Sequence, residues 1–144
     1  LLENVTYTTV DLSGNKYEIY AKFGEIDTKN PNVIFMKGVM AKITLEKNKE
    51  EILIKSDAAK HNNLNYETNF SKNINVIYNE HKIVCNHMYL NIENNFLTLY
   101  EDLVYSSNKG NINADRAEIN LLTKDMKIFM DDQIQDVKIN ISGT

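Results

Sequence analysis

A strand followed by a corner of small residues recurs four times along this chain, and this repeat limits the folds available to it. The corners stand 35, 29 and 29 residues apart, at Ala21, Ser56, Cys85 and Ala114. A second set follows three residues later, at Gly24, Ala59, Met88 and Ala117, and a third set two residues after that, at Ile26, His61, Leu90 and Ile119. A repeat near 30 residues predicts stacked hairpins. Ordinary self-similarity within a β-meander is the alternative explanation.

Between the corners, apolar and polar residues alternate with a period of two. In segment 17–23, Ile19 and Ala21 fall on one side and Glu18 and Tyr20 on the other. Successive side chains of a strand point to opposite faces of a sheet, so this pattern predicts half-buried strands. Segments 39–47, 74–78, 96–105 and 136–141 show the same pattern. The second strand of each unit is expected to begin near Phe35, Phe70, Leu99 and Phe129.

Composition excludes several classes of protein. A chain of 144 residues fits one domain, residues 1–144, and no stretch resembles a linker. A net charge of −4, with scattered basic residues, argues against a nucleic-acid partner, which needs a dense basic stripe. No apolar run reaches the roughly 20 residues of a membrane-spanning helix. The chain opens on Leu1 without an initiator methionine, so we expect it to be part of a longer or processed protein.

The sequence lacks the common catalytic and metal-binding patterns, and we expect no catalytic residues, no metal site and no cofactor. Phosphate-binding glycine loops, Gly-x-Ser-x-Gly and His-Glu-x-x-His do not occur. Glu101 and Asp102 are adjacent in a strand and should point to opposite faces, so they cannot act as a pair. Cys85, in an apolar strand, is expected to be a buried small residue. The histidines are expected at the surface or in turns: His61, His81 and His87.

Three motifs stand in a distinctive order and spacing along the chain. The opening VTYTTVDLSGNKYEIYAKFGEI has a strand, an Asp-x-x-Gly turn that begins at Asp11, and an apolar strand ending at Ala21. IKSDAAKH and INADRAEINLLTKDMKIFM each have a corner of the Ala-Asp-x-Ala kind, the second followed by a hairpin. Together these motifs resemble the periplasmic domain of the LptC family of lipopolysaccharide export systems, and the likeness covers about residues 4–141. The third unit, CNHMYLN, departs from it by placing Met88 and Tyr89 at the corner.

This resemblance implies an all-β fold, an antiparallel and partly open β-jellyroll of stacked hairpins. It implies a non-enzymatic lipid-transfer module that receives lipopolysaccharide from an inner-membrane LptBFG-type ABC transporter and passes it to an LptA-like periplasmic bridge protein. It also implies a periplasmic location, with an inner-membrane anchor helix before Leu1. A soluble LptA-like bridge component, a β-sandwich interaction domain without lipid binding, and a glycan-binding β-solenoid are the alternatives.

A carrier of acyl chains needs an apolar interior, because burying each methylene is worth about 0.8 kcal/mol. Ten residues are expected to face inward and contact lipid A acyl chains: Ile19, Phe35, Ile43, Ile54, Val76, Ile83, Leu99, Leu103, Ile112 and Met130. The same residues could instead fill the core of a closed sandwich.

An open jellyroll leaves unpaired strands at its two ends, and free edges pair with other chains. The candidate edges are segments 4–10 and 136–141, with these residues expected to contact partners: Tyr7, Thr9, Val137, Ile139 and Ile141. The resemblance assigns the N-terminal edge to the membrane transporter and the C-terminal edge to the bridge protein.

Overall fold

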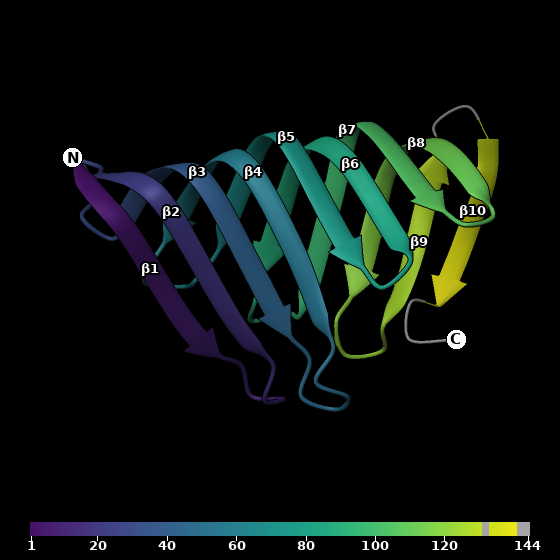
Figure 1. Ribbon diagram of the computed structural model, residues 1–144, viewed down its shortest axis with the longest axis horizontal. Helices are drawn as coiled ribbons and strands as arrows, with labels where there is room; N and C mark the ends of the chain where they lie inside the picture. The colour runs from purple at the N-terminus through teal and green to yellow at the C-terminus, as the bar shows by residue number, and fades with distance from the viewer. Residues whose placement is uncertain (131–132, 141–144) are drawn as a thin grey trace.

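The computed structural model describes residues 1–130 and 133–140, and side chains over residues 1–130. These residues form ten strands: β1 Leu2–Val10, β2 Lys16–Ile26, β3 Val33–Thr44, β4 Glu51–Asn62, β5 Thr68–Tyr78, β6 His81–Asn91, β7 Phe96–Ser107, β8 Gly110–Asn120, β9 Asp125–Met130 and β10 Gln133–Asn140. Each strand pairs antiparallel with its neighbours in sequence, so the sheet is one meander from β1 to β10 that does not close on itself (Figure 1). The predicted fold class, an antiparallel and partly open jellyroll, is confirmed.

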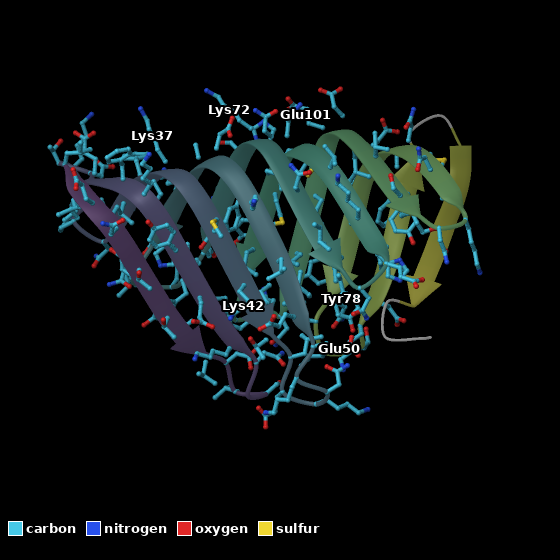
Figure 2. All side chains as sticks on the ribbon, viewed as in Figure 1. Lys37, Lys42, Glu50, Lys72, Tyr78 and Glu101 are labelled. Atoms are coloured by element: carbon cyan, nitrogen blue, oxygen red, sulfur yellow. The ribbon has the colours of Figure 1, made fainter. Side chains whose placement is uncertain are left out.

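The long strands bend near their middles, so the single sheet folds over a ridge into two layers (Figure 1). Figure 2 places Lys37, Lys72 and Glu101 along this ridge. We call the layer nearer the viewer the front layer; it holds residues 5–21, 39–56, 74–85 and 103–114. The back layer holds residues 23–37, 58–71, 87–100 and 116–130.

Backbone bulges produce the bend. The strand registers shift at the ridge between β4 and β5 and at each following pair through β8. Lys72 and Asn73 of β5 have φ values of 69° and 51°, and Gly38 of β3 has a φ of 66°. A bulge leaves an extra residue unpaired and bends its strand. In β7 the bulge residues are Glu101 and Asp102, and both side chains are exposed, so the expectation that they point to opposite faces is wrong.

The strand registers place the corner residues of the four units in equivalent positions of the meander. Ala21 and Ser56 both pair with Val39, while Cys85 pairs with Ile74. The four corner residues therefore lie beside the ridge on alternate strands of the front layer. On the back layer, pairing places one row of residues side by side: Gly24, Met36, Ala59, Phe70, Met88, Leu99 and Ala117. The third unit keeps the repeat despite its departure from the family pattern.

Apolar side chains fill the space between the layers. Ile54 and Ile74 of the front layer and Leu97 and Leu99 of the back layer are almost fully buried. A cavity between the layers has a volume of about 10 Å³ and is lined by Ile52, Val76, Tyr78, His81, Ile83, Ile119 and Met126. That volume is about what one water molecule needs. Over residues 1–130, the two layers are therefore packed against each other.

The repeat predicts that Met88→Ala destabilises the fold far more than Met40→Ala. Met88 is 1% exposed in the row of the back layer, whereas Met40 is 52% exposed on β3. Truncation of a buried methionine leaves a cavity and costs about 2–5 kcal/mol, and an exposed substitution costs less than about 0.5 kcal/mol. Urea unfolding measures both values. Equal losses would show that the third unit is out of register.

Candidate functional site

Nine of the ten residues expected to contact acyl chains lie between the two layers. Seven are 3% exposed or less: Ile19, Ile43, Ile54, Val76, Ile83, Leu99 and Leu103. Ile112 and Met130 are partly buried and pack against the same core. The fold thus brings side chains from strands β2 to β9 into one apolar interior, which in this structure they fill themselves.

The tenth residue, Phe35, is placed wrongly by the sequence pattern. Its side chain is 46% exposed on the outer face of the back layer, and Met36 takes the inward position. The cause is the size of the bulge. Three residues separate the inward residues of β5 and of β7 across the ridge, but only two separate Met36 from Val39 on β3. The step of four residues that joins inward positions on β5 and β7 reaches Phe35 when it is applied back from Val39, and Phe35 points outward.

Two polar side chains inside the sandwich, Tyr17 and His61, are hydrogen-bonded within their own layer, although His61 Nε2 has no partner among the described residues. In the front layer, the Tyr17 hydroxyl donates a hydrogen bond to Asp11 Oδ2 over 2.8 Å. Burial, followed by the Asp11 carboxylate, raises the pKa of Tyr17. In the back layer, His61 Nδ1 lies 2.8 Å from Thr68 Oγ1. Across the layers, the centroids of the Tyr7 and His61 rings lie 4.8 Å apart, with the ring planes tilted by 38°.

Opposite charges face each other at the edge of the sandwich opposite the ridge. Glu50 lies in the β3–β4 turn beside Tyr78, at the lower side of Figure 2. Burial first, and Glu50 second, raise the pKa of Tyr78 to about 12. Tyr78 and Asn79 in turn lower the pKa of Glu50, and Lys124 of the β8–β9 turn adds to this effect. The Tyr78 hydroxyl itself meets no partner of hydrogen-bonding geometry among the described side chains. This edge is thus closed by packing and by weak charge attraction.

The three histidines are not gathered into one site. His61 is 1% exposed, so the expectation of a surface position is wrong for it. His81 Nδ1 lies 2.6 Å from the Tyr105 hydroxyl, and His87 Nε2 lies 3.1 Å from Glu101 Oε2. Over the described part of the chain, no group of three metal-ligating side chains forms. Cys85 is buried as expected, and burial raises the pKa of its thiol to about 11.

The sheet ends where the sequence places its edges. Tyr7 and Thr9 are partly buried on β1, which pairs only with β2 among the described strands, and Tyr7 packs against the core. The backbones of Val137 and Ile139 on β10 pair with β9, while Ile141 lies outside the described residues. The front layer has a further edge that the sequence did not indicate. Segment 111–114 of β8 pairs with β7, but the described ladder to β9 starts at Arg116.

Sequence reasoning also missed a groove on the outer face of the back layer, with a volume of about 740 Å³. Its signal was present: Phe23 and Phe35 are aromatic residues at what prove to be outward positions on adjacent strands. Alternation along a strand identifies its inward face, but it does not show which outward residues of neighbouring strands lie together.

No protein-family model and no curated protein matches this chain. Within the described residues, no helix is long and apolar enough to cross a membrane.

Burial predicts that His61 makes the fold sensitive to acid. Burial lowers the pKa of His61 to about 4, below its ordinary value of 6.5, so the unfolded chain binds a proton first. The free energy of unfolding contributed by neutral His61 is complete above pH 6.5. It falls as the pH drops toward 4, by up to roughly 1.4 kcal/mol per pH unit.

His61→Phe should therefore flatten the fall in unfolding free energy between pH 6.5 and pH 4, measured by urea unfolding at each pH. Met40→Phe is the control, because Met40 is 52% exposed and carries no titrating group, and it should keep the slope of the unsubstituted protein. Identical slopes for the two variants would mean that His61 is not buried in its neutral form.

Proposed function

We propose that this chain is a non-enzymatic lipid-transfer module that receives lipopolysaccharide from an inner-membrane ABC transporter and passes it to a periplasmic bridge protein. One observation carries the proposal: an apolar interior lies between two layers of a single sheet that stays unclosed at both ends. The likeness of the repeat to the LptC family suggests the cargo, and the apolar lining of the interior supports contact with acyl chains once the layers part.

Acyl chains enter this interior by parting the layers at the edge opposite the ridge. The ridge is continuous backbone and acts as the hinge, while the hydrogen bonds of Tyr17 and His61 stay intact because each lies within one layer. Side chains such as Ile43 and Leu99 then exchange contacts with each other for contacts with lipid. Each methylene that leaves water contributes about 0.8 kcal/mol, so several acyl chains offset the separation of the layers.

The free edges serve for assembly. In this proposal β1 pairs with the membrane transporter, and β10 pairs with an LptA-like bridge protein by addition of a strand. Successive domains joined in this way continue one apolar interior from one chain to the next. The module works in the periplasm, attached to the inner membrane through an anchor helix; an LptA-like soluble bridge component would use the same two edges.

The filled interior favours one alternative, a β-sandwich interaction domain that pairs by its edges and binds no lipid. The cavity of about 10 Å³ between the layers has no room for an acyl chain unless the layers move. Lipid contact inside the sandwich therefore separates the two functions.

A photo-crosslinking side chain at Ile43 or Leu99 should label a lipid A analogue, because both residues face the interior from opposite layers. Lys42 is the matched control: it neighbours Ile43 but lies on the outer face, in ion pairs with Glu18 and Glu51. Mass spectrometry of the adducts gives the labelled position. Labelling at Lys42 without labelling at the inward positions would leave the interaction domain as the function.

Removal of residues 136–144 should weaken capture of the bridge protein at least tenfold while lipid labelling at Leu99 is retained. The truncation deletes most of β10, whose backbone pairs with β9 from Gln133 to Asn140. Surface-immobilised capture measures partner binding, and far-ultraviolet circular dichroism confirms that the remaining sheet is folded. Undiminished capture by the truncated chain would exclude β10 as the assembly edge.

A further inference from the structure

One row of paired residues runs across the outer groove of the back layer, which Leu1 also lines. Phe23, Lys37, Ala58, Ser71 and His87 stand side by side on strands β2 to β6. The side chains of Ala58 and Ser71 are short, so they form a floor on β4 and β5. The longer side chains of the row form a wall on either side of that floor. The resulting volume of about 740 Å³ falls within the range of small-molecule sites.

The walls combine aromatic rings with ammonium groups. The Phe35 ring extends the wall on β3, and Lys60 Nζ lies 5.8 Å from its centroid. Lys37 and Lys60 line the groove together with a single acidic residue, Glu25. The lysine–glutamate ion pairs of Lys16 and Lys42 lie on the outer face of the front layer, away from this groove. The groove is therefore cationic at its rim in a chain whose net charge is −4.

We infer that this groove binds an anionic amphiphile with one acyl chain. The chain lies over Ala58 against Phe23 and Phe35, and the anionic headgroup meets Lys37 and Lys60. Charge and shape both favour this occupant. An apolar floor without cations would suit a neutral lipid equally well, whereas two ammonium groups beside aromatic rings select a chain with a negative end.

The width of the groove argues against a helix from a partner protein. The backbones of β3 and β6 are three strand spacings apart, about 14 Å. The side chains of Phe35, Lys37 and His87 occupy part of that width from both sides. The remaining space is narrower than the 10–12 Å diameter of a helix with its side chains. An extended acyl chain is much thinner and fits along the floor.

This site is separate from the interior between the layers, and the inference does not rest on the proposed function. Ala58 and Ser71 face outward from the back layer, whereas Ala59 and Phe70 beside them face the core. A ligand in the groove needs no movement of the layers. Failure of the groove to bind would leave lipid labelling at Ile43 and Leu99 unaffected. Failure of that labelling would likewise leave binding in the groove unaffected.

Isothermal titration of the full chain with dodecyl phosphate below its critical micelle concentration tests the site. The unsubstituted protein should bind one molecule, and dodecyl maltoside or inorganic phosphate should bind at least tenfold more weakly. Ala58→Phe, which fills the floor, and Lys37→Glu with Lys60→Glu, which reverse the rim, should each weaken binding at least tenfold. Asn75→Phe and Lys55→Glu, on the outer face of the front layer, are the matched controls and should bind like the unsubstituted protein.

Thermal unfolding of each variant, followed by circular dichroism, shows that the sheet is intact. Equal affinity for dodecyl phosphate and dodecyl maltoside would overturn the assignment of an anionic headgroup. Unchanged affinity in folded Ala58→Phe protein would overturn the site itself, as would the absence of binding to the unsubstituted protein.

Discussion

The bend that the long strands make at the ridge is the constraint on which the rest of the structure depends. It turns a flat meander into two layers that face each other, and it sets which side chains become the core. The bend needs an extra residue in the left-handed region, such as Lys72 and Asn73 of β5, or a residue without a side chain, such as Gly38 of β3. Because the ridge runs across the sheet, continuous backbone joins the two layers along it. Elsewhere, over residues 1–130, the layers meet through side-chain contacts.

That geometry explains how a filled interior is compatible with a carrier function. Ladder hydrogen bonds keep each layer rigid, and polar groups such as His61 and Tyr105 are bonded within their own layer. Over the described side chains, apolar packing closes the sandwich. Packing between apolar surfaces has no fixed partner, so an acyl chain can replace it. A closed barrel, which shares ladder hydrogen bonds all round, could admit the same ligand only through its mouths.

The sequence predicted the strands and their repeat well, because alternation and spacing are local signals that survive in the folded sheet. Met88 lies in the predicted row even though its corner departs from the family pattern. The errors arose at the ridge. Alternation fails at a bulge, so Phe35 was placed inside and Glu101 and Asp102 on opposite faces, and nothing in the sequence shows that β3 bends with one residue fewer than β5. The burial of His61 and the outer groove depend on contacts between strands, which alternation along one strand does not report.

The most direct test of this account is a distance between the two layers, measured by electron spin resonance with and without a lipid A analogue. Spin labels at Leu53→Cys on the front layer and Lys127→Cys on the back layer report the separation, since both native side chains are exposed and the native Cys85 is buried. Labels at Tyr20→Cys and Lys82→Cys, both on the front layer, serve as the reference pair. The account predicts that lipid lengthens the first distance and leaves the second unchanged. A lipid-bound protein whose layers keep their spacing would contradict it.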